Sequence, residues 1–335
     1  MLRIAMLSFA HVHADGYARQ VSSHPEAEIT CVWDSDEARG RAAAQKFNAP
    51  YLADLETTLR RDDVDAVVVN AETVRHKEVL LAAVAHNKHI FTEKALTITT
   101  ADADEVVRAV NASGIKFMIS LPSRTRPETL FLKQVLDKGW LGRITMMRAR
   151  IAHSAALGRW FKGGSLWFGD AAQAGGGALF DLGCHTADVM RWFLGEPANV
   201  IAKVQNFSSA YDIDDQTLAV IEFKNGALGI LDTSWVHHAG PNPLELYGTE
   251  GYVGYSGRPG DQIQLISSQL QPGGLQGAIL PAKLPDPLPS AMEQWISAIL
   301  HETPMSITVE DGRNLTELLE GIYAAANSGC QHQFG

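Results

Sequence analysis

The chain has 335 residues, of which 46% are apolar and 20% charged, a composition typical of a globular protein with room for two domains. Its net charge of −10, without any Lys/Arg-rich run, argues against nucleic acid and anionic membranes as partners, because both recruit clustered cations. Three widely separated cysteines predict no disulfide framework, and no signal peptide or membrane-spanning run is recognisable, so we expect a cytoplasmic protein.

The first 120 residues alternate short apolar runs with helical patterns. The apolar runs lack the polar alternation of a half-exposed strand, so they predict a parallel sheet that is covered on both faces. Strands joined by helices make right-handed crossovers, which is the doubly wound, Rossmann-like arrangement. We expect strands at residues 3–7, 27–33, 64–70, 88–92 and 115–120, and helices at residues 14–23, 36–47, 75–86 and 100–114.

After about residue 121 the apolar and polar residues begin to alternate, which predicts antiparallel strands with one face exposed to water or to a subunit interface. The predicted fold class is therefore α/β, with a Rossmann-like domain followed by an α+β domain that contains a large open, mainly antiparallel sheet. We expect a helix at residues 126–142, strands at 144–153, 199–207, 216–223 and 226–236, and a Pro- and Gly-rich loop at 271–289. The expected boundaries are 1–121 for the dinucleotide-binding domain, 122–305 for the substrate and oligomerisation domain, and 306–335 for a C-terminal helix that packs back on the N-terminal domain.

The stretch "SFAHVHADG" (residues 8–16) directly follows the first predicted strand and supports two hypotheses. Its H-x-H pair is typical of metal hydrolases, whereas its position is that of the phosphate loop of a dinucleotide-binding fold. Asp34 follows His13 by 21 residues, at the end of the second strand, where such a fold binds the adenosine ribose. No His or carboxylate partner set recurs at later strand ends, so the phosphate-loop hypothesis is favoured and no metal ion is expected.

The same loop departs from the pattern G-x-G-x-x-G, because Ser8, Ala10 and His13 stand where glycines are expected. Ser and Ala still permit a close approach of the pyrophosphate, but the bulk of His13 leaves open a Rossmann-like domain that binds no nucleotide. If a nucleotide binds, Asp34 is followed by a Ser and an Asp and offers no Arg to a 2′-phosphate, so NAD is expected rather than NADP.

Two further segments carry polar residues at informative positions. Glu93 and Lys94 lie just past a buried strand, at the sheet edge where such folds bind ligands, although an isolated E-K dipeptide is also typical of a surface salt pair. In "GGGALFDLGCHTAD", the spacing of Asp181, His185 and Asp188 places all three on one helical face. A carboxylate that fixes an imidazole is what a proton-abstracting His requires, although such pairs are also common on surfaces.

The order and spacing of these segments resemble the glucose-fructose oxidoreductase and inositol dehydrogenase family (Gfo/Idh/MocA). The likeness covers essentially the whole chain and includes "NAETVRHKEVLLAAVAHNKHIFTEK", "SRTRPETLFLKQVLDKGWLGRI", "GGGALFDLGCHTAD" and "LYGTEGYV". The resemblance implies that Lys94 contacts the nicotinamide ribose and the reacting hydroxyl, that Asp181 and His185 form the catalytic pair, and that Arg124 lies near the substrate. Two tryptophans, Trp160 and Trp167, either stack on a sugar or pack in the core. The expected cofactor contacts are made by Ser8, Phe9, Ala10, His11, His13, Asp34, Asn70, His76, Glu93 and Lys94. The expected substrate contacts are made by Arg124, Trp160, Trp167 and Asp181.

The chain also departs from the family at one peptide bond, because it has "EKA" where the family has E-K-P. A cis bond before Ala95 would cost about 2.5–4 kcal/mol, whereas before a proline it would cost under ~1 kcal/mol. We therefore expect a trans bond and a slightly shifted Lys94.

Together these observations predict an NAD-dependent oxidoreductase that acts on a secondary alcohol of a sugar, polyol or related carbohydrate. Two alternatives remain open: a non-redox glycosidase or lyase that keeps NAD on the same scaffold, and a binding or regulatory protein that has lost the cofactor. An open sheet must cover its second face, so we expect a homodimer or homotetramer that pairs through it.

Overall fold

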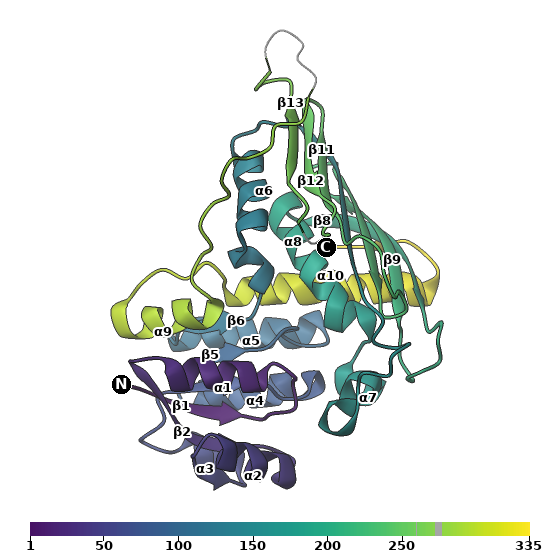
Figure 1. Ribbon diagram of the computed structural model, residues 1–335. Helices are drawn as coiled ribbons and strands as arrows, with labels where there is room; N and C mark the ends of the chain where they lie inside the picture. The colour runs from purple at the N-terminus through teal and green to yellow at the C-terminus, as the bar shows by residue number, and fades with distance from the viewer. Residues whose placement is uncertain (259, 272–276) are drawn as a thin grey trace. The chain divides into compact units, whose positions relative to one another are not determined.

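The computed structural model describes residues 1–258, 260–271 and 277–335, and these residues form two compact units (Figure 1). Residues 272–276 of the expected Pro- and Gly-rich loop lie outside the described residues. Unit 1 comprises Met1–Leu121, Phe161–Gly175 and Pro289–Thr316. Unit 2 comprises Pro122–Trp160, Gly176–Leu288 and Glu317–Gly335.

Unit 1 is built on a parallel sheet with the strand order β3-β2-β1-β4-β5-β6. The order runs outward in both directions from the pair β1 and β4, which makes this pair the topological switch point of a doubly wound fold. The predicted Rossmann-like arrangement is thus confirmed. Its strands are β1 (Leu2–Leu7), β2 (Ala27–Trp33), β3 (Tyr51–Leu52), β4 (Ala66–Val69), β5 (His89–Thr92) and β6 (Phe117–Ile119).

The helices of unit 1 have one buried face each. In α1 (Ala14–Ser23) the buried residues are Ala14, Tyr17, Ala18 and Val21, which is the i, i+3, i+4, i+7 spacing of an amphipathic helix. Asp36 accepts a hydrogen bond from the Arg39 backbone amide and thereby caps α2. The other helices of this unit are α2 (Glu37–Lys46), α3 (Leu55–Leu59), α4 (His76–Ala85), α5 (Thr100–Ser113), α7 (Ala171–Ala174) and α9 (Ala291–His301).

Unit 2 contains the predicted open sheet, with the strand order β13-β12-β11-β7-β10-β9-β8-β14. Every neighbouring pair is antiparallel except β7 and β10, which run parallel. The alternation expected for such a sheet is clearest in β9, where buried and exposed residues alternate along the strand. The strands are β7 (Ile144–Ala152), β8 (Pro197–Gln205), β9 (Gln216–Phe223), β10 (Leu228–Ser234), β11 (Leu244–Gly248), β12 (Gly251–Tyr255), β13 (Gln264–Ser267) and β14 (His332–Gln333).

Unit 2 also contains the helices α6 (Pro127–Asp137) and α8 (Cys184–Leu194). Helix α8 carries His185 and Asp188 and contacts β7 and β10. The long C-terminal helix α10 (Val309–Ser328) belongs to unit 1 up to Thr316 and to unit 2 from Glu317 onward. Within the described part of the chain, no helix is both long and apolar enough to cross a membrane.

Candidate functional site

Four polar residues form a row along the carboxyl edge of the parallel sheet. Leu7 of β1 is in register with Trp33 of β2 and with Val69 of β4, and Val69 is in register with Thr92 of β5. The residue after each strand therefore emerges at the same edge, next to the switch point. These four residues are Ser8, Asp34, Asn70 and Glu93, and the structure buries all of them.

Ser8 adopts the backbone conformation for which a glycine is expected. Its φ of 72° lies in the left-handed region, although Ser carries a Cβ atom. Its hydroxyl donates to Asp34 at 3.3 Å and accepts from the Ala10 amide at 3.1 Å. The carbonyl of Ala10 in turn accepts from the Trp167 indole at 2.9 Å. The loop after β1 therefore makes the tight turn of a phosphate loop with side-chain hydrogen bonds in place of glycines.

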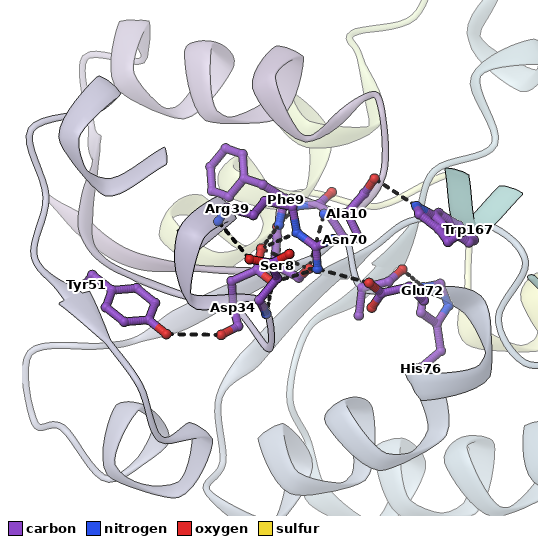
Figure 2. A network of polar contacts seen from close by, with 12 residues as sticks. Ser8, Phe9, Ala10, Asp34, Arg39, Tyr51, Asn70, Glu72, His76 and Trp167 are labelled. Carbon is purple, nitrogen blue, oxygen red and sulfur yellow. Dashed lines mark hydrogen bonds and ion pairs between the residues drawn. The ribbon is translucent and has the colours of Figure 1, made fainter. Parts of the chain in front are cut away.

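Asp34 is held by an arginine that was not expected (Figure 2). Arg39 binds its carboxylate through Nε at 2.8 Å and through Nη2 at 2.7 Å, and the same Nη2 reaches Glu72 at 2.9 Å. Asp34 also accepts from the amide of Phe9 at 2.7 Å. The statement that no Arg lies near Asp34 is thus wrong, because the first turn of α2 brings residue 39 back over the end of β2.

The electrostatics of this network keep Arg39 charged. Burial lowers its pKa, but the hydrogen bond with Asp34 and the charges of Asp34 and Glu72 outweigh burial, so the pKa of Arg39 lies above its usual value. Two carboxylates share one guanidinium, and their side chains are 0% and 9% exposed. A buried charge requires a partner of opposite charge, so the side chains of Asp34, Arg39 and Glu72 form one ion-pair network at the carboxyl edge of the sheet.

Hydrogen bonds connect the segment after β4 to the loop after β1 at the carboxyl edge of the parallel sheet. Asn70 donates through its side-chain amide to the Ser8 carbonyl at 3.4 Å, and its own carbonyl accepts from the His11 amide at 3.0 Å. His76 is fully enclosed and its Nδ1 lies 2.8 Å from the carbonyl of Ala95. Burial lowers the pKa of His76, so the imidazole is neutral at physiological pH and donates to that carbonyl.

Glu93, directly after β5, contacts residues of the loop after β1, of α1 and of its own segment. Its Oε1 lies 2.8 Å from His13 Nδ1 and accepts a hydrogen bond from the hydroxyl of Tyr17, while its Oε2 accepts from the Lys94 amide at 3.0 Å. Burial raises the pKa of Glu93, but its interactions with His11, His13 and Lys94, including the hydrogen bond from His13, outweigh burial, so this pKa lies well below the usual value. Glu93 is therefore an ionised carboxylate without access to solvent.

The peptide bond between Lys94 and Ala95 is cis, so the expectation of a trans bond is wrong. The expectation rested on the intrinsic free-energy cost of a cis bond before Ala95, which takes account only of the two residues that the bond joins. In the folded chain both residues are buried, the Lys94 amide donates to Glu93, and the Ala95 carbonyl accepts from His76. The second of these contacts joins residues 19 positions apart, so the two residues of the bond do not reveal it.

In unit 2, Asp181 lies on a π-helical turn rather than on a regular α-helix. The turn spans Leu179–Gly183, and α8 begins at Cys184. The four positions from Asp181 to His185 therefore run from this π-helical turn into the first turn of α8, and their placement on one face stays a prediction. The carboxylate of Asp181 accepts a hydrogen bond from the Trp235 indole at 3.2 Å.

His185 lines a cavity of about 260 Å³ within unit 2. Polar groups converge on it: Arg126 lies exposed at the N-cap of α6, and Arg150 is held by Asp232 at 3.1 Å. A mostly preformed concavity with a few polar side chains is what a small-molecule site requires. The lining residues are Ser123, Arg126, Thr129, Arg150, Ile151, His185, Thr186, Val189, Asn242, Pro243, Leu244, Tyr255 and Gly257.

Arg124 makes a buried ion pair instead of lining this cavity. Its Nη2 donates to Asp188 at 2.7 Å, its Nε donates to the same carboxylate, and both side chains are at most 5% exposed. The guanidinium also lies over the Trp192 ring at 5.4 Å. Asp188 is thus the ion-pair partner of Arg124, and this pair links the segment before α6 to helix α8.

The two tryptophans belong to different units. Trp167 of unit 1 is 5% exposed and stacks on Phe168 with 4.0 Å between ring centroids, so it packs against the phosphate loop. Trp160 of unit 2 is 52% exposed and lies 4.8 Å from the His153 ring. Of the two, Trp160 has the exposed face that stacking on a sugar requires.

The sequence analysis did not predict four residues of the candidate site. These are Arg39, Glu72 and Tyr17 at the carboxyl edge of the parallel sheet, and Arg126 at the cavity of unit 2. One signal was present for Arg39: it lies five residues after Asp34, within the first turns of a helix that starts at the strand end. No such local signal exists for Tyr17, because its contact with Glu93 joins residues 76 positions apart.

Two family models match the chain. A model described as an oxidoreductase family with an NAD-binding Rossmann fold matches residues 3–121, and one described as a GFO/IDH/MocA C-terminal domain matches residues 129–254. Together they include the loop after β1, the strand ends of unit 1 and the helix with Asp181 and His185.

The relatives act mostly on sugars and inositols, as their names state. The chain is 26% identical to the 1,5-anhydro-D-fructose reductase of Ensifer adhaerens over 85% of its length and 84% of the relative. It is 23% identical to the myo-inositol 2-dehydrogenase of Thermotoga maritima over 93% and 92% of the two chains. A 2,7-anhydro-N-acetylneuraminate hydratase of Mediterraneibacter gnavus is 24% identical over 68% of this chain and 60% of that relative.

Solved structures share the whole fold. GenD2 from gentamicin A biosynthesis, in complex with NAD, has a TM-score of 0.81 and 26% identity, covering 100% of this chain and 96% of the other. A levoglucosan dehydrogenase in complex with NADH and levoglucosan has a TM-score of 0.85 at 21% identity and covers 99% of each chain. At that identity the second likeness shows the fold alone.

Proposed function

Because the chain belongs to the Gfo/Idh/MocA family of oxidoreductases, we propose that it transfers a hydride between NAD and a secondary alcohol of a sugar, polyol or related carbohydrate. The observation that carries the proposal is the row of Ser8, Asp34, Asn70 and Glu93 at the switch point, where doubly wound sheets bind dinucleotides. The relatives named as a fructose-derivative reductase and an inositol dehydrogenase support the substrate class.

The residues of this edge fit a dinucleotide. The left-handed turn at Ser8 leads into the N-terminus of α1, which favours the negative charge of a pyrophosphate. Asp34 at the end of β2 is placed to bind the adenosine ribose, with Phe9, Ala10, His11 and His13 along the loop. NAD, when bound, supplies the hydride acceptor.

For the substrate, we assign the proton transfer to His185. Its imidazole takes the hydroxyl proton, and Asp181, whose carboxylate is oriented by Trp235, favours the charged form of the base. The ammonium of Lys94 stabilises the oxygen as it loses its proton. Arg126 and Trp160 offer hydrogen bonds and a stacking face to the sugar, whereas Arg124 positions α8 through Asp188.

We also propose that NAD is preferred over NADP, now for a different reason. Arg39 is already neutralised by two carboxylates, those of Asp34 and Glu72. A 2′-phosphate would bring a third negative group to a single guanidinium, and it would have to displace Asp34 from its strongest contacts. NAD brings no such charge.

The test is turnover of a panel of sugars and inositols with NAD, followed by NADH absorbance. Lys94→Met should lower kcat/KM by about 10²-fold or more while circular dichroism stays that of the wild type. Lys116→Met is the matched control, because its ammonium pairs with Glu302 at 2.9 Å on an exposed surface. Unchanged activity in Lys94→Met, or equal loss in both variants, would contradict the assignment.

A second candidate is a reaction without net redox change, in which tightly held NAD is reduced and reoxidised within one turnover. The relative named as a hydratase favours it. In that case the protein converts a substrate and binds NAD in calorimetric titration, but free NADH does not accumulate. If calorimetry detects no NAD binding at all, the third possibility, a binding or regulatory protein, replaces both.

We propose that the chain forms a homodimer or homotetramer through the open sheet. One face of the sheet exposes Ile201, Leu218 and Val220 at 53%, 47% and 40%. These lie in a depression together with Ala325 of α10 and with Gly329 and Cys330, which follow it. Size-exclusion chromatography with light scattering should give a dimer or larger species, and Leu218→Glu should shift it to the monomer.

The cellular setting that we propose is the reducing cytoplasm. In the described residues all three cysteines are thiols rather than disulfides, and Cys31 and Cys184 are buried. Retained activity in excess reductant would agree with this proposal.

A further inference from the structure

We propose that His11, His13 and Glu93 form a binding site for one first-row divalent transition metal ion, with Zn²⁺ as the best fit. Each residue offers one ligand atom, and these three atoms all lie within 4.8 Å of one another. The two imidazoles come from the loop between β1 and α1, and the carboxylate comes from the end of β5. The site lies entirely within unit 1 and does not rest on the proposed function.

The distances are close to those of a coordination shell. Zn²⁺ binds His nitrogen and carboxylate oxygen at about 2.0–2.2 Å, so two ligands of a tetrahedral site lie about 3.3–3.6 Å apart. Here Glu93 Oε1 is 2.8 Å from His13 Nδ1 and 3.7 Å from His11 Nδ1. Movements of a few tenths of an ångström bring both pairs to the required separation, and the remaining adjustment falls on His13, which is 51% exposed.

The ligand atoms are also in a suitable chemical state. His11 Nδ1 accepts a hydrogen bond from the His13 amide at 3.2 Å, so it carries a lone pair rather than a proton. Metal binding replaces this long hydrogen bond and the shorter one from His13 Nδ1 to Glu93 Oε1 at 2.8 Å, and His13 releases its Nδ1 proton. The Tyr17 hydroxyl and the Lys94 amide donate to the Glu93 carboxylate and orient it. Partners of this kind hold a ligating carboxylate in place.

The donor set selects the type of ion. Two imidazoles and one carboxylate suit Zn²⁺ and its neighbours in the first transition series, whereas Mg²⁺ and Ca²⁺ prefer oxygen ligands. Three protein ligands leave at least one coordination position for water or another ligand.

The experiment uses the full-length protein without cofactor or substrate. The protein is treated with EDTA, freed of the chelator and titrated calorimetrically with ZnCl₂, and a parallel sample is loaded with Co²⁺ for visible absorption. We expect about one equivalent of Zn²⁺ and a Co²⁺ spectrum of low coordination number. His13→Ala should weaken binding by about 10-fold or more, because it removes a direct ligand.

His301→Ala is the matched control. His301 is also 51% exposed and also lies close to a glutamate, with Nε2 3.0 Å from Glu26, but among the described residues this pair belongs to no cluster of three ligand atoms. It should leave Zn²⁺ affinity unchanged. The proposal is overturned if the wild type binds no stoichiometric metal, if His13→Ala binds as tightly as the wild type, or if both variants lose affinity equally. None of these outcomes depends on NAD binding or turnover, so each is distinguishable from a failure of the proposed function.

Discussion

Replacing Arg39 by Ala tests how much its guanidinium, which pairs with the Asp34 and Glu72 carboxylates, contributes to the free energy of unfolding. The change leaves Asp34 and Glu72, whose side chains are 0% and 9% exposed, without their cation. Removing one partner of a buried ion pair typically costs about 3–5 kcal/mol. Asp34 keeps its hydrogen bonds from the Phe9 amide and the Ser8 hydroxyl, so we expect the lower end, about 3 kcal/mol.

The assay is equilibrium unfolding in urea, with the free energy of unfolding taken from the midpoint and slope of the transition. Arg41→Ala is the control on the same helix. Arg41 pairs with Glu37 at 2.7 Å, but both side chains are more than 60% exposed, so we expect a loss of at most about 0.5 kcal/mol. If Arg39→Ala destabilises the protein no more than Arg41→Ala does, the ion pair contributes nothing and the reasoning is refuted.

Three further predictions concern stability. The pKa of His76 is lowered by burial, so the unfolded chain binds the proton more readily, and stability should be complete above about pH 6.5 and fall as the pH drops below it. His76→Gln should flatten this acid limb in urea unfolding at a series of pH values; an unaltered limb would refute it. Gly177→Ala should destabilise strongly, because its Cβ would lie 1.9 Å from the Asp214 carbonyl oxygen, whereas Gly16→Ala in α1 meets no atom within 4 Å and should stabilise by about 0.5–1 kcal/mol. The two midpoints should therefore move in opposite directions. Tyr323→Phe removes the hydroxyl that donates to the half-buried Asp214 carboxylate at 2.7 Å and should cost about 1–3 kcal/mol in thermal or urea unfolding; a loss near zero would show that water replaces it.

The sequence by itself determined the type and order of most elements. Strands that are apolar throughout can only be covered on both faces, so the five predicted strands of unit 1 were sufficient to indicate a parallel, doubly wound sheet. The same local logic located Asp34 and Glu93, because a polar residue directly after a buried strand must emerge at the carboxyl edge of the sheet. Alternation in the second half indicated the open sheet. Short elements without periodicity, such as β3 (Tyr51–Leu52) and α3 (Leu55–Leu59), were not predicted.

Only the tertiary structure decided which side chains meet. The guanidinium of Arg39 binds Asp34 and Glu72, Tyr17 reaches Glu93, and Arg124 is taken by Asp188. Apart from Arg39 and Asp34, which are five positions apart, these pairs join residues 33 to 76 positions apart, which come together through strand register and helix packing. Hydrophobic patterns record how one segment meets the core, whereas polar contacts depend on the relative positions of several segments at once.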